Sequence, residues 1–150
     1  MNELLLRNGY EPYLPLQTTL RQWSDRKKKV TTPLFNSYIF VFALEQDIAR
    51  ILTIPGMAWN IRHEGKPASL SDHELELIRR FVSTGLFIET SAADPDEMRS
   101  GDRVQVIDGP LAGVKGFVTR DAESQRLLVE IESIHQVIRV QIPAYLLKKA

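Results

Sequence analysis

The chain has 150 residues, enough for one domain or two small ones, and its 43% hydrophobic and 25% charged content is that of a folded globular protein. Its 19 basic and 19 acidic side chains cancel, so any contact with nucleic acid must come from a local patch rather than from total charge. The absence of Cys excludes disulfides and thiolate sites, and the three His residues supply no metal-binding cluster. Without a membrane-length apolar run or a signal-peptide pattern, we expect a cytoplasmic protein that does not enter a membrane.

The first half of the chain predicts a mixture of helix and strand. Residues 3–8 are typical of the end of a helix, with Gly9 as its left-handed terminator. Residues 11–17, with two prolines, predict an extended edge strand, and the polar residues 18–32 a loop. The aromatic and β-branched run 38–43 is typical of a strand buried on both faces.

The clearest helix begins at Ser71, where Glu74 three residues later completes a capping-box pattern. An apolar stripe at helical spacing follows, and Gly85 closes the helix. Before it, residues 46–52 predict a short helix and residues 57–62 a strand.

Composition changes near residue 90. Small polar residues and a proline predict a linker over residues 91–98. Short alternating strands and tight turns then predict a small β-barrel over residues 99–150 that folds on its own, with Ile134 exposed near a loop tip.

No catalytic constellation is present in the sequence. No nucleophile-elbow pattern surrounds any Ser, and the glycines lie between strands, whereas a dinucleotide loop needs them between a strand and a helix. We therefore expect no enzyme and no cofactor.

A basic cluster is the first candidate site. Its members are Arg21, Trp23, Arg26, Lys27, Lys28 and Lys29. Clustered cations beside an aromatic ring can follow a phosphate backbone and stack a base. The same residues also fit a solvated loop that keeps neighbouring strands soluble, and composition leaves both interpretations open.

A second candidate precedes the apolar strand. Composition favours a core role for Pro33, Leu34 and Phe35, since apolar residues at the entrance of a strand usually pack inside. An exposed aromatic patch at this place would instead be a protein-binding site.

The most specific motif spans residues 101–118, where two strands flank a glycine-rich loop. It closely resembles a KOW motif, the strand-loop-strand signature of small SH3-like barrels in transcription and ribosomal proteins. The candidate loop residues are Asp108, Gly109, Gly113, Lys115 and Gly116. A purely structural role, shaping the turn, is the alternative for each glycine.

With the KOW run placed, the upstream half resembles the N-terminal domain of the NusG family. The resemblance rests on residues 10–15, the basic loop, residues 33–41 and 54–57, and the turn 65–68. It implies an α+β protein with an N-terminal α/β sandwich and antiparallel sheet over residues 1–90. A linker at 91–98 and an SH3-like KOW barrel over 99–150 complete the implied organisation.

The resemblance implies a transcription elongation or antitermination factor without catalytic activity. Pro33, Leu34, Phe35 and Tyr38 fall at the family's contact with the clamp helices of RNA polymerase. The basic loop would lie near upstream or non-template DNA. The barrel would recruit ribosomal protein S10 or Rho through a tip at Ile134 and His135. A ribosome-associated KOW module that binds RNA is the alternative function.

Three departures from the family pattern carry further expectations. Asn36-Ser37 stands where Pro-Gly is usual, which indicates a specialised paralogue. Ile134-His135 stands where Phe-Gly is usual, which removes a typical aromatic anchor for Rho and S10.

The third departure is the family's first strand, which has no counterpart because the chain begins within the expected helix. A domain truncated in this way would carry an open apolar groove beside Tyr38, Phe40 and Phe42. Either a neighbouring segment fills such a groove or two copies associate through it. Since soluble monomers rarely tolerate an open groove, we expect self-association through this site.

Overall fold

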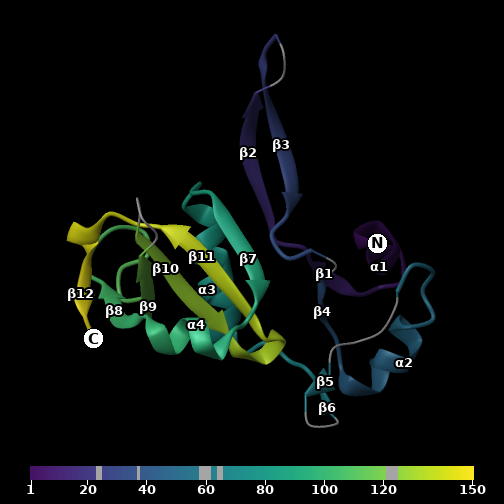
Figure 1. The fold of residues 1–150 in the computed structure, drawn as a ribbon. Helices are drawn as coiled ribbons and strands as arrows, with labels where there is room; N and C mark the ends of the chain where they lie inside the picture. Colours follow the sequence, from purple (N-terminus) through teal and green to yellow (C-terminus); the bar gives the residue numbers. More distant parts are fainter. Residues whose placement is uncertain (23–24, 37, 58–61, 64–65, 121–124) are drawn as a thin grey trace.

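The computed structural model describes residues 1–22, 25–36, 38–57, 62–63, 66–120 and 125–150 (Figure 1). The N-terminal elements are α1 (Asn2–Arg7), β1 (Glu11–Tyr13), β2 (Leu16–Gln22), β3 (Lys27–Pro33), β4 (Phe40–Phe42), η1 (Glu45–Asp47), α2 (Ile48–Ile51), β5 (Arg62–His63) and β6 (Lys66–Pro67). The remaining elements are α3 (Asp72–Ser83), β7 (Ile88–Ala92), α4 (Pro95–Ser100), β8 (Asp102–Val106), β9 (Lys115–Arg120), β10 (Gln125–Ile131), η2 (Glu132–Ile134), β11 (Gln136–Gln141), η3 (Ala144–Leu146) and β12 (Leu147–Lys149).

The expected helices are present where local signals mark their ends. Gly9 follows α1 in the left-handed region at φ +82°. The Ser71 hydroxyl and the Glu74 backbone N–H form the capping box of α3 together with the reciprocal bond from the Ser71 N–H to the Glu74 carboxylate. Gly85, at φ +71°, comes shortly after the helix ends. The strand expected at 57–62 lies mostly outside the described residues.

The loop expected at residues 18–32 is wrong, because most of this segment forms an antiparallel hairpin. Strands β2 and β3 pair in register from Leu16 opposite Pro33 to Gln22 opposite Lys27. The segment is rich in threonine and has a valine, residues with high β-propensity, so its polarity reflects exposure rather than lack of structure.

Strand β4 lies between two apolar clusters. Tyr38 and Phe40 pack against the main core, whereas Ile39 and Val41 pack against a smaller cluster of α1 and α2. These four side chains are only half-buried, and Phe42 is 83% exposed. The expectation of a strand buried on both faces is therefore wrong in degree, because among the described residues β4 pairs only with the short strand β1.

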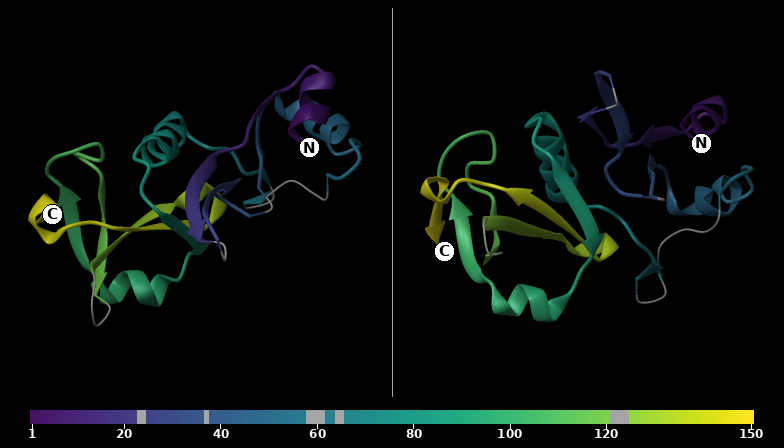
Figure 2. Two further views of the ribbon diagram at one scale, coloured as in Figure 1. Left: turned by 90° about the horizontal axis from the view of Figure 1, so that it is seen from above. Right: turned by 45° about the horizontal axis from the view of Figure 1, so that its top comes forward.

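The C-terminal strands form one antiparallel sheet in the order β12-β8-β9-β10-β11-β7. Among the described residues the sheet is open, with β12 at one edge and β7 at the other, so a closed SH3-like barrel stays a prediction. Helix α3 contributes to the core on one face of this sheet and α4 to a cluster on the other (Figure 2).

The expected linker at 91–98 contains regular structure. Strand β7 pairs with β11 from Ile88 opposite Val140 to Ala92 opposite Gln136. Helix α4 follows, because the Asp94 side chain accepts the Asp96 N–H at 3.0 Å and a proline occupies the first helical turn. The Asp-Pro pair starts a helix here.

One main core connects the two halves of the sequence. It contains Leu34 and Phe35, the buried face of α3, Ile88 of β7 and alternate residues of β8, β10 and β11. In the described part of the chain, no helix is both long and apolar enough to cross a membrane.

Candidate functional site

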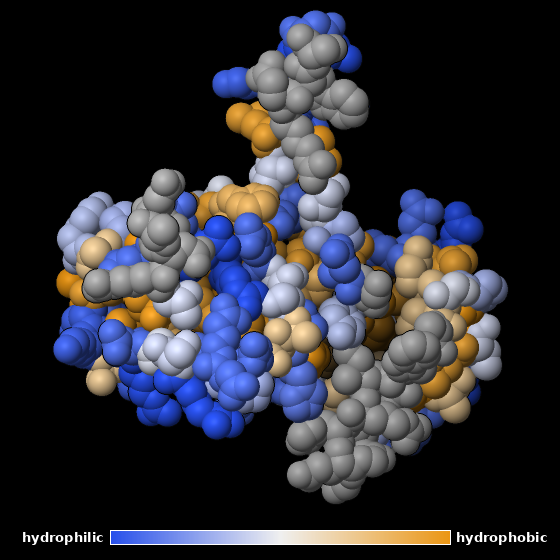
Figure 3. All heavy atoms as spheres, in the orientation of Figure 1, coloured by the Kyte–Doolittle hydropathy of each residue, from blue (hydrophilic) through white to orange (hydrophobic). Residues whose placement is uncertain are grey.

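The β2–β3 hairpin projects away from the body of the molecule (Figure 1). Beneath its hydrophilic end, hydrophobic side chains lie on its stem (Figure 3). Four of the expected nucleic-acid residues, Arg26, Lys27, Lys28 and Lys29, are exposed on the β3 side of the tip. Trp23 lies outside the described residues.

Strand register distributes the basic positions over both faces of the hairpin. Lys27 and Lys29 share one face with Leu20, which is 65% exposed, while Lys28, whose partner in register is Arg21, lies on the other. Positive charge on two faces of a narrow ribbon suits a polyanion that surrounds the ribbon, such as a nucleic-acid groove. The hairpin thus brings Arg21, Lys27, Lys28 and Lys29 together on two paired strands.

The expected polymerase-binding residues separate into surface and core. Pro33 is exposed and Tyr38 is half-buried, whereas Leu34 is 3% and Phe35 1% exposed. The Phe35 ring meets Phe40 edge-on at 6.0 Å between centroids. For Leu34 and Phe35 the core role that composition favours is therefore the one seen in the structure.

Tyr13 joins Phe35 and Phe40 in a group of aromatic rings, and the guanidinium of Arg79 lies over the Tyr13 ring. The Tyr13 ring stacks on Phe40 at 6.4 Å, and the Arg79 guanidinium lies 5.4 Å from the centroid of Tyr13. Burial raises the pKa of Tyr13, and the nearby Arg79 offsets part of that rise. The aromatic residues thus link β1 and β4 to α3.

Local backbone geometry accounts for the glycines of the loop between β8 and β9 and at the start of β9. Gly109 and Gly113 take left-handed conformations, at φ +85° and +88°. A Cβ on Gly116 would lie 2.4 Å from the Leu128 carbonyl oxygen of the neighbouring strand. The Asp108 carboxylate accepts the Gly109 N–H at 2.8 Å, and Lys115 is exposed at the start of β9.

Helix α3 holds both ends of the C-terminal sheet through contacts that the sequence did not indicate. Arg80 donates to the carbonyl oxygens of Pro110 and Ala112 in the loop between β8 and β9, at 2.9 and 2.8 Å. At the other end, the Glu74 carboxylate accepts the Ser133 N–H at 3.1 Å and its hydroxyl at 2.5 Å. Only Glu74 carried a sequence signal, as part of the capping box.

The hydrogen bonds around Glu74 change its acidity. Burial alone would raise the pKa of Glu74, but bonds from Ser133 and Ser71 outweigh that effect and hold the pKa below its ordinary value of 4.5. The carboxylate is therefore favoured in its ionised form in the folded protein.

The two residues of the expected partner-binding tip differ in exposure. Ile134 is 5% exposed, because η2 turns it into the core formed with α3, and its expected exposure is overturned. His135 is exposed in the left-handed region at φ +52°. Only His135 of this pair lies at the surface.

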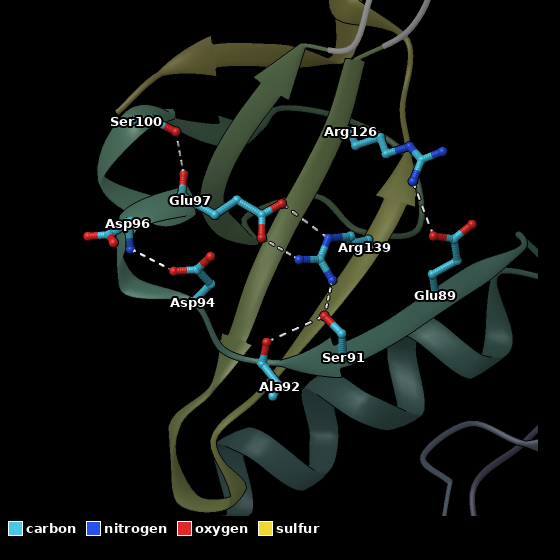
Figure 4. Close-up of polar contacts among 9 residues, drawn as sticks. All are labelled: Glu89, Ser91, Ala92, Asp94, Asp96, Glu97, Ser100, Arg126 and Arg139. Carbon is cyan, nitrogen blue, oxygen red and sulfur yellow. Dashed lines mark hydrogen bonds and ion pairs between the residues drawn. The ribbon is translucent and has the colours of Figure 1, made fainter.

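Polar contacts fix α4 to the opposite face of the sheet (Figure 4). Arg139 of β11 is bonded to Glu97 of α4 and to the Ser91 hydroxyl of β7. Arg126 of β10 pairs with Glu89 of β7 at 3.1 Å. These bonds crosslink strands and helix, so they are accounted for by the fold and do not form a separate site.

The base of the hairpin is bonded to β7. The Gln17 side-chain amide donates to the Ile88 carbonyl oxygen at 2.8 Å and accepts the Ile88 N–H at 3.1 Å. The Thr90 hydroxyl donates to the Leu34 carbonyl oxygen at 2.9 Å. No sequence motif identified Gln17.

Comparison with known proteins gives one family. The family model described as "NusG: Transcription termination factor nusG" matches residues 1–79. These residues include the β2–β3 hairpin, strand β1 with Tyr13, residues 33–42 and the first two turns of α3. A search of curated proteins finds no match.

Proposed function

The chain belongs to the NusG family, and we propose that it is an elongation or antitermination factor that binds RNA polymerase and changes pausing or termination. The match over residues 1–79 is the observation that carries this proposal, because it spans both the projecting hairpin and residues 33–38, the expected contact with polymerase. Members of this family act in transcription and are not enzymes. The mechanism is differential binding, in which the factor stabilises one conformation of polymerase relative to others.

For contact with the polymerase clamp helices, the accessible residues are Pro33 and Tyr38. Leu34 and Phe35 support that surface from the core beneath it. Tyr38→Ala should weaken polymerase binding by about 1–3 kcal/mol if its ring is an anchor. Tyr145→Ala is the matched control, because Tyr145 is 77% exposed on η3 in the C-terminal part. Equal affinity of both variants would remove Tyr38 from the interface.

The basic hairpin is proposed to contact upstream or non-template DNA weakly. The exposed cations stand at the end of a projecting ribbon, while the whole chain has no net charge. A local contact of this kind adds to a protein–protein interface without giving strong binding to free DNA. Recruitment of ribosomal protein S10 or Rho has less support, because Ile134 is buried.

Co-purification separates this function from the rival one. A tagged chain expressed in cells should retain RNA polymerase subunits after nuclease treatment. A ribosome-associated KOW module would instead retain ribosomal RNA and lose it on nuclease treatment. Recovery of ribosomal particles without polymerase would overturn the proposal.

A further inference from the structure

Among the described residues, β7 is an edge strand of the C-terminal sheet. On its outer side, the side chain of Gln17 forms hydrogen bonds with the backbone of Ile88. Ile88 stands opposite Val140 of β11, yet its N–H and carbonyl both bond to Gln17 on the other side. One donor and one acceptor exchanged with a single residue is the pattern of a hydrogen-bonded pair in an antiparallel sheet. A primary amide offers both groups, so the Gln17 side chain takes the place of a neighbouring strand.

A second bond strengthens the junction two residues further along β7. The Thr90 hydroxyl donates to the carbonyl oxygen of Leu34, and the Leu34 N–H bonds to the Pro15 carbonyl oxygen at 2.8 Å. Pro15 and Leu34 flank the two strands of the hairpin, so this bond closes its base. Ile88 is 2% exposed and Leu34 3%, and the bonds of Gln17 and Thr90 to them are part-buried.

We propose that Gln17 is a positioning residue that joins the hairpin to the edge of the C-terminal sheet, so that the two keep a fixed mutual orientation. This orientation matters for function through the proposed contact of the hairpin with DNA. A two-stranded ribbon that projects from the body has few contacts of its own to hold its direction. An arm held in advance loses less conformational freedom when it binds, which favours affinity.

Distance measurements between spin labels test the junction directly. Because the chain has no Cys, Leu20→Cys on the hairpin and Gln141→Cys on β11 give two defined labels. Both side chains are exposed. We expect one narrow distance distribution in the doubly labelled parent and a broad one after Gln17→Met, which keeps the length but has neither donor nor acceptor of the amide.

Two further variants sharpen this measurement. Gln17→Glu keeps the shape but cannot donate to Ile88, and it should broaden the distribution as well. Thr18→Ala is the control, because the Thr18 hydroxyl pairs with Thr31 across the hairpin at 2.9 Å and not with β7. Hydrogen exchange at the Ile88 amide should quicken at least about tenfold in Gln17→Met, which removes the acceptor of the Ile88 N–H, and not in the control. Narrow distances in both Gln17 variants, with unchanged exchange in Gln17→Met, would overturn the proposal.

Binding to an elongation complex with upstream duplex DNA tests the functional part. Gln17→Met should lower affinity about three- to tenfold because the arm is no longer preorganised, and it should leave the salt dependence unchanged because no cation is removed. If neutralising the lysines of the hairpin has no effect on binding, the proposed DNA contact fails, while the distances still report on Gln17. If the lysines matter and Gln17→Met binds like the parent, the positioning role is refuted.

Discussion

Among the glycines of residues 101–118, Gly116 has the tightest steric constraint. A methyl group there would lie 2.4 Å from a backbone oxygen of β10, which cannot move without disturbing the sheet. We expect Gly116→Ala to lower the free energy of unfolding by about 1–3 kcal/mol. Gly113→Asn is the control, since Asn tolerates left-handed backbone and nothing lies within 4 Å of that position. Denaturant melts that show equal stability for both variants would contradict this account.

Glu74 predicts a pH dependence at its contact with Ser133. Since its pKa in the folded state is lowered, its stabilising contribution is present above the ordinary value of 4.5 and disappears as pH falls through the folded-state pKa. The stability difference between the parent and Glu74→Gln should therefore shrink on acidification below pH 4.5. Glu76→Gln, at an exposed position of the same helix, is the control.

Denaturant unfolding between neutral pH and about pH 3 checks this expectation, with about half a pH unit between points near the ordinary carboxyl value. A difference between parent and Glu74→Gln that grows on acidification would have the wrong sign. It would show that Glu74 is favoured in its protonated form in the folded protein.

Individual residues are predictable where the signal is local. Ser71 and Glu74 reveal a helix start because both partners of the capping box lie within one turn. Gln17 and Arg80 carry no such signal, since their partners lie 71 and 30 or more positions away in the chain. The sequence predicts an exposed Ile134 at a loop tip. The alternation of apolar residues along a strand does not reveal that α3 packs against the turn that follows the strand.

At the scale of elements, the hairpin makes the sharpest prediction. Replacing Lys27, Lys28 and Lys29 with Gln should weaken binding to an elongation complex. It should also reduce the slope of log affinity against log salt by about 0.9 for each duplex phosphate that the side chains no longer neutralise. Replacing Lys148 and Lys149 of β12 with Gln is the control at two other exposed lysines. An unchanged slope in the hairpin variant would leave only the solvated-hairpin interpretation.

Whether a segment is a loop, a strand or a helix is harder to predict where its polar composition suggests a loop but its backbone forms regular structure. The hairpin resembles a loop in sequence because its side chains face solvent, and only its pairing reveals two strands. The Asp94-Pro95 pair is typical of a linker, although the same pair also suits the first turn of a helix. Strand β8 is predictable because Val104 and Val106 alternate with polar neighbours, whereas β10 and β11 are predictable from their content of β-branched and apolar residues.

At the scale of the whole molecule, the small β1–β4 sheet predicts self-association. Phe42 is 83% exposed and Leu44 63%, beside a strand that has one partner in the described residues. An exposed apolar edge of this kind favours pairing with a second copy. Light scattering at micromolar concentration should give a mass above that of the monomer.

Phe42→Lys should restore the monomer in the same experiment, because a charge at the edge opposes strand pairing. Phe87→Lys is the control, since Phe87 is 62% exposed but lies between α3 and β7. A parent chain that scatters as a clean monomer would refute self-association through β4.

We propose that this NusG-family chain binds RNA polymerase. The most direct test of this proposal is size-exclusion chromatography of the purified chain with purified RNA polymerase, with and without an assembled nucleic-acid scaffold. We predict that the chain co-elutes with polymerase in both cases and that the scaffold increases the bound fraction. Elution of the chain apart from polymerase in both cases, at concentrations well above micromolar, would contradict the account.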